Sequence, residues 1–232
     1  MSITGHTVKA FDEDLGELRA LVSEMGGRAE TAITDAVNAL IQRNFEAASR
    51  IVANDKRIDE LEAEVERRVV RIIALRAPMA DDLREVLAAL KISGVIERIG
   101  DYAKNIAKRA PLVAEAGRIE ASTLLSAMGA AVAAMVHDVL DAFAARDTEK
   151  AAEVWARDKS IDDFYNSLFR TLLTHMMENP HSITASTHLL FIGKNLERMG
   201  DHATNVAEMV YYAATGEQLG ERARGADALG SE

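Results

Sequence analysis

The two halves of this chain repeat each other, and this duplication constrains the fold more than any other feature of the sequence. Asp55–Asp59 reads Asp-Lys-Arg-Ile-Asp, and Asp158–Asp162 reads Asp-Lys-Ser-Ile-Asp, 103 residues later. A longer segment, Glu97–Ala107, recurs at Glu197–Ala207, an offset of 100, with the shared pattern Glu-Arg-x-Gly-Asp-x-Ala-x-Asn-x-Ala. Self-similarity of this length predicts a tandem duplication of one structural unit.

Helical periodicity runs through both halves. Apolar residues recur at steps of three and four from Thr7 to Met25, which predicts a long amphipathic helix. Aromatic residues make up only 5% of the chain and proline 3 of its 232 residues, so helix is favoured over strand. Turn-forming interruptions separate six helical segments of about 30 residues, or about 45 Å, each. The interruptions are Asn44, Arg76–Pro78, Pro111 with Gly117, Arg146–Thr148 and Asn179–Pro180.

These patterns together predict an all-α fold of two tandem three-helix bundles, built from six long antiparallel helices. We assign residues 1–113 to the first bundle, 114–216 to the second and 217–232 to a polar tail. The join between the two units falls between Pro111 and Gly117.

Each repeated motif carries two carboxylates at positions i and i+4, one turn apart on the same helix face. Residues equidistant from the turn of an antiparallel hairpin lie at the same height. The motif centres in the first half are residues 57 and 99, and their midpoint is the turn residue Pro78. In the second half the centres are 160 and 199, and their midpoint falls on the Asn179–Pro180 turn. We therefore expect four carboxylates to meet in each half: Asp55, Asp59, Glu97 and Asp101, and then Asp158, Asp162, Glu197 and Asp201.

Four ionised carboxylates in one place either raise a pKa or recruit a cation. Oxygen donors suit hard divalent or trivalent metal ions, with magnesium, manganese, calcium, iron or zinc as candidates. The alternative is that neighbouring basic side chains neutralise the acids as surface ion pairs. The basic residues beside the motifs are Lys56, Arg57, Arg98, Lys159 and Arg198.

Small and amide residues accompany the acids in both copies. Gly100 and Gly200 indicate a close approach of two backbones at the level of the acids, with or without a ligand. Asn105 and Asn205 either support the acidic site or form a hydrogen bond between helices. The histidines lack partners at ligand spacing, and the methionines lie in segments rich in Leu and Val, so both are interpreted as structural.

Composition excludes several classes of protein. The formal net charge is −10 and no basic block stands apart, so nucleic acid is not an expected partner. The absence of cysteine excludes disulfides and sulfur-ligated metals. Met1–His6 has no signal-peptide pattern, and the apolar run Ala121–His137 is too short and too weakly apolar for a transmembrane segment. A cytoplasmic protein is therefore expected.

The chain resembles the PhoU family from about His6 to Tyr212. The resemblance is carried by the two Asp-x-x-Ile-Asp motifs, by Pro-Met-Ala-Asp-Asp-Leu-Arg at Pro78–Arg84, and by the doubled Glu-Arg-x-Gly-Asp motif. It implies two three-helix bundles side by side, with the eight acidic positions above binding multinuclear metal clusters in some members. Two residues before the motif Glu, where relatives often carry a polar or acidic residue, this chain has Val95 and Asn195. The first site would therefore bind metal more weakly or differently.

The resemblance also implies a function. The family regulates phosphate uptake negatively, contacting the ATPase subunit of a phosphate ABC transporter and a sensor histidine kinase, so that phosphate-starvation genes are held off when phosphate is plentiful. We therefore predict a non-enzymatic, metal-binding cytoplasmic adaptor, peripheral at the inner membrane through its partners and homodimeric through an apolar face. Two alternatives stay open. One is a carboxylate-metal enzyme that hydrolyses phosphoesters or oxidises iron, and the other is a metal-free helical interaction module.

Overall fold

The computed structural model describes the backbone of residues 3–114 and 121–219, and over this part of the chain it contains helices and no strands. The helices of the first half are α1 (Ile3–Gln42), α2 (Phe45–Asn54), α3 (Lys56–Arg76) and α4 (Ala80–Ala114). Those of the second half are α5 (Ser122–Ala145), α6 (Thr148–Ala156), α7 (Asp158–Glu178), the short 3₁₀ turn η1 (Pro180–Ser182) and α8 (Ile183–Thr215). The predicted all-α fold of two tandem three-helix bundles is confirmed.

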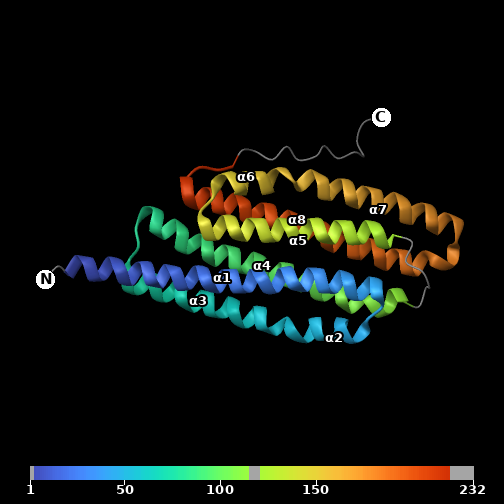
Figure 1. Ribbon diagram of the computed structural model, residues 1–232, viewed down its shortest axis with the longest axis horizontal. Coiled ribbons are helices and arrows are strands. Elements are labelled where there is room, and N and C mark those ends of the chain that lie inside the picture. Colours follow the sequence, from blue (N-terminus) through green and yellow to red (C-terminus); the bar gives the residue numbers. More distant parts are fainter. Residues whose placement is uncertain (1–2, 115–120, 220–232) are drawn as a thin grey trace.

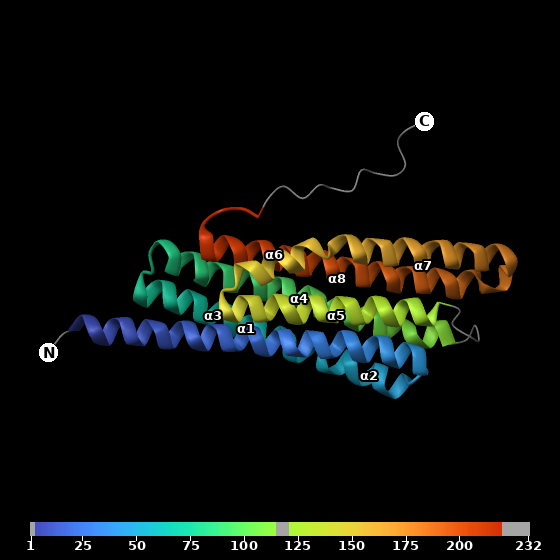
Figure 2. The same cartoon turned by 45° about the horizontal axis from the view of Figure 1, so that its top comes forward.

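Four long helices form the centre of the molecule. Each of α1, α4, α8 and α5 packs against the next, and α5 packs back against α1, so that they make a closed ring. In this ring α1 and α4 run in one direction and α5 and α8 in the opposite one (Figure 1). The rod α2–α3 covers the seam between α1 and α4, and the rod α6–α7 covers the seam between α5 and α8 (Figures 1 and 2). Each half is thus a three-helix bundle, and the two bundles share one continuous apolar core.

The rods α2–α3 and α6–α7 are each broken into two helices, which the sequence analysis did not predict. Asp55 separates α2 from α3, and the Ile58 N–H donates to the Asp55 carbonyl at 2.8 Å, a tight bond of the 3₁₀ kind. Arg157 separates α6 from α7, and the Ser160 N–H donates to its carbonyl at 3.0 Å in the same pattern. Local 3₁₀ geometry inside a helical rod marks strain or function. Here it falls at or directly before the first acid of each motif.

Polar caps begin the broken rods. The Asn44 side chain accepts a hydrogen bond from the Ala47 N–H at 3.0 Å and so caps α2. Asp147, 103 residues later, accepts from the Glu149 and Lys150 N–H groups and caps α6. These side chains satisfy N–H groups that have no partner within the first helical turn. The interruptions predicted at Asn44 and at Arg146–Thr148 are confirmed.

The two bundles meet through equivalent residues, as expected for a pseudo-twofold relation between repeats. Gly26 in α1 lies against Leu140 in α5, and Gly129 in α5 lies against Val37 in α1. The two contacts are equivalent, because Gly129 is the counterpart of Gly26 and Leu140 is the counterpart of Val37, each at an offset of 103 residues. On the opposite face, Tyr102 of α4 stacks on its own counterpart, His202 of α8, with ring centroids 5.6 Å apart. The pseudo-axis therefore passes through both seams between the bundles.

Three details differ from the sequence predictions. The first helix begins at Ile3, earlier than the predicted Thr7. Pro111 lies inside α4 and not in the connection, because a proline so near the end of a helix removes only one hydrogen bond of its last turns; Gly117 lies outside the described residues. By length and composition α5 is apolar enough to cross a membrane, because its most apolar stretch of 18 residues has a mean hydropathy of 1.6. Half of that stretch is buried inside the bundle, as expected for a core helix.

Candidate functional site

The first set of predicted acids lies between the broken rod and α4. Asp55 occupies the break itself, Asp59 follows one turn later in α3, and Glu97 and Asp101 lie on the facing part of α4. The two elements approach closely, since a Cβ at Gly100 would lie 2.8 Å from Ile58 Cδ1 and 3.5 Å from Asp55 Oδ1. Glycine at this position therefore lets the α4 backbone reach the level of the acids, as its presence in both motifs predicted.

Mutual repulsion is evident in the proton affinities of these carboxyl groups. Burial, followed by the charges of Asp101, Glu62, Asp59 and Asp55, raises the pKa of Glu97 to about 7. Burial and the neighbouring Asp55 also raise the pKa of Asp59. The four predicted acids thus interact electrostatically, and Glu62, one turn beyond Asp59, joins them with a pKa raised by burial and by Glu66. We call these five residues the first cluster.

A lysine that the sequence analysis did not single out neutralises part of the first cluster. Lys104 Nζ donates hydrogen bonds to Asp55 Oδ2 and to Asp101 Oδ1, and so bridges the break to α4. The hydrogen bonds and charges of both carboxylates raise the pKa of Lys104 against the opposing effect of its burial. The spacing was available in the sequence, because Lys104 is three residues after Asp101 and lies on the same helix face.

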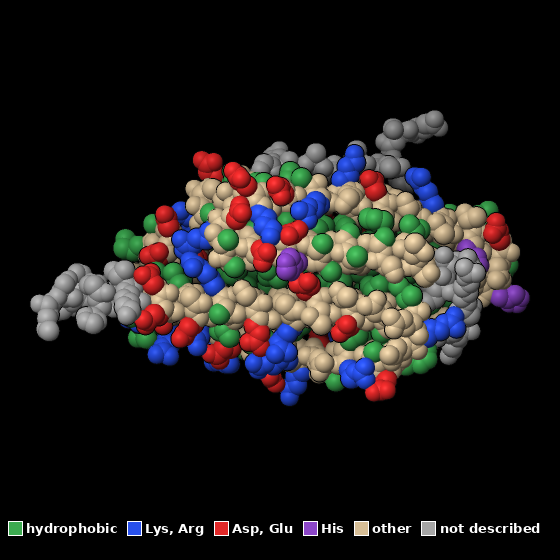
Figure 3. Space-filling model, in the orientation of Figure 1, with side chains coloured by type: hydrophobic (Ala, Val, Ile, Leu, Met, Phe, Trp, Pro, Cys, Tyr) green, Lys and Arg blue, Asp and Glu red, His purple; other side chains and the backbone are tan. Residues whose placement is uncertain are grey.

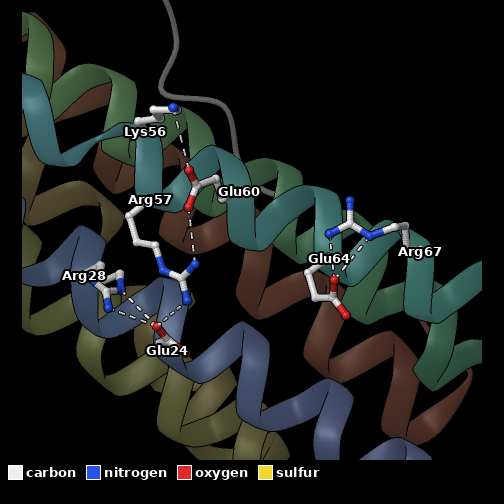
Figure 4. A network of polar contacts seen from close by, with 7 residues as sticks. All are labelled: Glu24, Arg28, Lys56, Arg57, Glu60, Glu64 and Arg67. Atoms are coloured by element: carbon white, nitrogen blue, oxygen red, sulfur yellow. Dashed lines mark hydrogen bonds and ion pairs between the residues drawn. The ribbon is translucent and has the colours of Figure 1, made fainter.

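Of the basic residues proposed as neutralising partners, Arg98 lowers the pKa of Glu62 in the first cluster, whereas Lys56 and Arg57 pair elsewhere. Arg57 forms ion pairs with Glu60 at 3.3 Å and with Glu24 of α1 at 3.6 Å, and Lys56 approaches Glu60 at 3.9 Å (Figure 4). Lys56 and Arg57 therefore belong to an exposed network on the outer side of α3, which also contains a Glu64–Arg67 pair (Figure 4). Their expected role as partners of Asp55 and Asp59 is not seen.

The second cluster lies at the equivalent place between α7 and α8. Gly200 approaches Ile161, with 3.2 Å between a built Cβ and Ile161 Cγ2. Burial raises the pKa of Glu197, Asp201 and Asp162 raise it further, and a hydrogen bond from Lys194 lowers it. Glu197, Asp162 and Asp201 are thus close enough to interact. Lys194 Nζ lies 2.6 Å from Glu197 Oε1, while Glu197 Oε2 is buried without a hydrogen-bond partner.

The two clusters differ in the position of their lysine. Lys104 of the first cluster is replaced by Thr204 in the second, and the Thr204 hydroxyl donates to the Asp201 carbonyl at 2.7 Å. Lys194 of the second cluster is replaced by Gly94 in the first. Of the two asparagines, Asn105 is exposed, and Asn205 lines a groove between α4 and α8.

The donor chemistry of both clusters suits a hard cation, but the side-chain geometry does not yet form a coordination shell. Within the described residues, no group of three or more Asp, Glu or His side chains converges closely enough to hold one metal ion. In the first cluster, the Lys104 ammonium lies between Asp55 and Asp101, where a cation would have to lie. In the second cluster, Glu197 Oε2 is a buried carboxylate oxygen without a hydrogen-bond partner. The second cluster thus has a carboxylate oxygen without a protein partner, whereas in the first cluster Lys104 already supplies positive charge.

Comparison with known proteins gives a consistent result. A family model described as PhoU domain matches the chain twice, at residues 22–110 and 125–210. The phosphate-specific transport system accessory protein PhoU homolog of Zymomonas mobilis is 60% identical over 228 residues, which are 98% of this chain and 96% of the relative. The accessory protein PhoU of Serratia marcescens is 35% identical over 229 residues, 99% of this chain and 93% of the relative.

Solved structures agree with the fold described above. The crystal structure of PhoU from Pseudomonas aeruginosa matches with a TM-score of 0.86 and 37% identity, covering 89% of this chain and 100% of the other. The phosphate transport system regulatory protein PhoU from Streptococcus pneumoniae matches with a TM-score of 0.84 and 30% identity, covering 91% of this chain and 100% of the other.

Proposed function

Because the chain belongs to the PhoU family, we propose that it is a non-enzymatic regulator of phosphate uptake that acts as an accessory to a phosphate-specific transport system. The observation that carries this proposal is the match of both repeats to one family, together with the 96% coverage of a relative named as a phosphate-specific transport system accessory protein. The protein would contact the ATPase subunit of the transporter and a sensor histidine kinase from the cytoplasmic side of the membrane, and would keep phosphate-starvation genes off when phosphate is plentiful.

The acidic clusters are proposed to bind hard cations in this role. In the second half, Asp158, Asp162, Glu197 and Asp201 would hold the ion, and in the first half Asp55, Asp59, Glu97 and Asp101 would do so after displacement of Lys104. A bound cation supplies positive charge that relieves the repulsion within each cluster. Because the acids come from two helical elements, that relief would tie the broken rod to the third helix of each bundle.

The regulatory role is tested by deleting the gene and measuring a phosphate-starvation reporter at high external phosphate. Loss of the protein should switch the reporter on, and the intact gene supplied in trans should switch it off again. A reporter that stays off in the deletion strain would contradict the proposal. Phosphoester hydrolysis by the purified protein, lost in Asp101→Ala and Asp201→Ala together, would favour the enzyme alternative instead.

Cation binding needs a separate test, because a regulator can function without it. Elemental analysis of protein purified from cells supplied with manganese, iron and zinc should find metal, and Asp162→Asn/Asp201→Asn should contain less of it. Metal content indistinguishable from that of a protein known to bind none, even with excess metal, would remove cations from the proposal and leave the regulatory role intact.

A further inference from the structure

The ring of four central helices has four seams, and only two of them are covered. The α1/α4 seam is filled by α2–α3, and the α5/α8 seam by α6–α7. The α1/α5 and α4/α8 seams carry no such helix from the described part of the chain (Figures 1 and 2). On the α1/α5 face acidic and basic side chains are interspersed (Figure 3), which gives no preference for the charge of a partner.

The α4/α8 seam is different, because it contains a groove of about 800 Å³ lined by basic residues. Arg84, Lys91 and Arg98 line it from α4 at intervals of seven residues, and Ala88 and Val95 lie between them at the same interval. His202 and Met209, and Asn205 and Tyr212, line it from α8, again seven residues apart. Two helices that present residues at heptad spacing form the kind of seam into which a third helix packs.

The positive charge of this groove is only partly compensated. Arg84 is held by Asp81 at 2.7 Å and Arg98 interacts with Glu62, whose pKa it lowers, whereas Lys91 forms no ion pair within the described residues. Glu208, the acidic residue of the groove, accepts a hydrogen bond from Trp155 Nε1 at 3.1 Å. Burial and then Arg98 lower the pKa of His202, so His202 adds no positive charge at neutral pH. A basic stripe of three residues on one helix contrasts with the net charge of the chain, which is −10.

The same groove also exposes apolar surface. Leu87 on α4 is 39% exposed and Tyr212 on α8 is 47% exposed. Met209, one turn before Tyr212 on α8, also lines the groove. Apolar side chains flanked by cations match an amphipathic helix with an apolar stripe and acidic edges. Inorganic ions or a nucleic acid backbone would leave this apolar surface unused.

The pseudo-equivalent half of the α4/α8 face, on the other side of the Tyr102–His202 stack, is occupied by larger side chains, of which Phe191 is 51% exposed. Arg109 lies 4.7 Å over the Phe191 ring and its Nη1 lies 3.2 Å from His188 Nδ1. These three residues replace Met209, Lys91 and Ala88 of the open half, at an offset of 100. The duplication thus produced two equivalent half-grooves, of which one has been filled by larger side chains and the other has stayed open and basic.

We propose that the open half of the α4/α8 seam, lined by Arg84, Lys91 and Arg98, is the docking site for an acidic amphipathic helix of a partner protein. The partner's carboxylates at positions i and i+7 are about 10.5 Å apart, the same distance as the side chains of Lys91 and Arg98 on α4. Its apolar stripe covers Leu87, Val95, Met209 and Tyr212. The site adjoins the first cluster, since Arg98 interacts with Glu62, and it would serve the regulatory role proposed above, although the binding test does not depend on that role.

Two occupants from the chain itself fit less well. Residues 220–232 follow directly on Leu219, which lines the groove, but they carry Arg222 and Arg224 against three acidic residues and are close to neutral. A second copy of the chain would have to present an apolar helix face with acidic edges. The exposed apolar residues of α7, Phe169, Leu173 and Met177, lie beside Arg170 with no acidic residue between them.

The test uses the full-length protein and a fluorescein-labelled synthetic peptide of about three heptads with leucine at the core positions and glutamate at the flanking ones. The control peptide has lysine in place of every glutamate. Fluorescence anisotropy should show saturable binding of the acidic peptide, weakened by salt, and none of the basic peptide. In Lys91→Glu/Arg98→Glu, the affinity for the acidic peptide should fall at least about tenfold and the basic peptide should bind instead.

Two further variants separate docking from general electrostatics. Arg71→Glu/Arg170→Glu makes the same change in net charge on exposed positions of α3 and α7, and should bind the acidic peptide as the wild type does. Ala88→His/Lys91→Phe/Met209→Arg copies the filled half into the open one and should abolish binding while the circular dichroism spectrum and melting temperature stay close to wild type.

Three results would overturn the inference. The first is an absence of saturable binding by the acidic peptide, or equal effects of the two double charge reversals. The second is binding that appears only when the chain is truncated after Leu219, which would identify the chain's own tail as the occupant. The third is a loss of self-association in Lys91→Glu/Arg98→Glu measured by sedimentation, which would assign the groove to a second copy.

Discussion

Lys104 should hold the first cluster together in the absence of metal, and its replacement by methionine tests this. The methionine side chain keeps much of the aliphatic stem and removes only the ammonium group. Asp55 would then lose its partner with its side chain 8% exposed, whereas Asp101 is 44% exposed and can be solvated by water. Breaking a fully buried pair costs about 3 to 5 kcal/mol and an exposed pair at most about 1, so a pair of mixed exposure should cost about 2 kcal/mol.

A double-mutant cycle assigns this loss to the Asp55 contact. If Lys104→Met destabilises because Asp55 is left charged and unpaired, then adding Asp55→Asn should restore part of the stability. The expected coupling free energy between the two positions is about 1 to 2 kcal/mol. As a matched control, Lys108→Met removes an exposed lysine one turn further along α4 and should change stability by no more than about 0.5 kcal/mol.

Cations provide a second readout of the same contact. Without Lys104, a divalent ion no longer competes with an internal ammonium, so the variant should gain more stability from manganese than the wild type does. At a free ion concentration ten times the dissociation constant, binding adds about 1.4 kcal/mol. The assay is urea unfolding followed by far-ultraviolet circular dichroism, with chelator and then with manganese. Additive effects of Lys104→Met and Asp55→Asn, or an unchanged response to manganese, would refute the reasoning.

Three further predictions concern other parts of the structure. The pKa of Glu97 is about 7 in the folded protein and 4.5 ordinarily, so its contribution to stability is fully present below pH 4.5 and is lost as pH rises through 7. With chelator present and solvent screening allowed for, Glu97→Gln should therefore have a free energy of unfolding about 1 to 2 kcal/mol higher than wild type at pH 8, and the same as wild type at pH 4.5. A Cβ at Gly26 would lie 2.2 Å from Leu140 Cδ1, whereas nothing lies within 4 Å at Gly27, so Gly26→Ala should destabilise by about 1 to 3 kcal/mol and Gly27→Ala should stabilise by about 0.5 to 1 in urea unfolding. Asn44→Ala and Asp147→Ala should each lower the free energy of unfolding by about 1 kcal/mol through loss of a helix cap, and equal melting temperatures for variant and wild type would contradict this.

Much of the architecture followed from local patterns. Apolar periodicity, the Asn44 and Asp147 caps and the Pro78 and Pro180 turns are properties of short segments, so they could be located without a structure. The convergence of Asp55 and Asp59 with Glu97 and Asp101 could also be predicted, because height along an antiparallel hairpin is a matter of counting from the turn. The same count brings Asp162 and Asp201 close to Glu197 in the second half.

The partners of the acids show where local reasoning was incomplete. Successive helical residues point about 100° apart, so Lys56 and Arg57 turn away from the face that carries Asp55 and Asp59. Lys104 follows Asp101 by three residues and returns to the shared face, and the same argument applies to Lys194 and Glu197. These partners were within reach of helical geometry alone, whereas the helix breaks at Asp55 and Arg157 have no clear signal in the residue pattern.

The sequence by itself determined the helices, their duplication and the height at which the acidic motifs meet, because each of these depends on spacing within one chain segment. Only the tertiary structure decided which faces of the two repeats pack together. It placed Gly26 against Leu140, stacked Tyr102 on His202, filled one half of the α4/α8 seam with Arg109 and Phe191, and left the half lined by Lys91 open. The choice between these surfaces depends on side-chain volumes contributed by residues about 100 positions apart, and packing between distant segments leaves no periodic trace in a sequence.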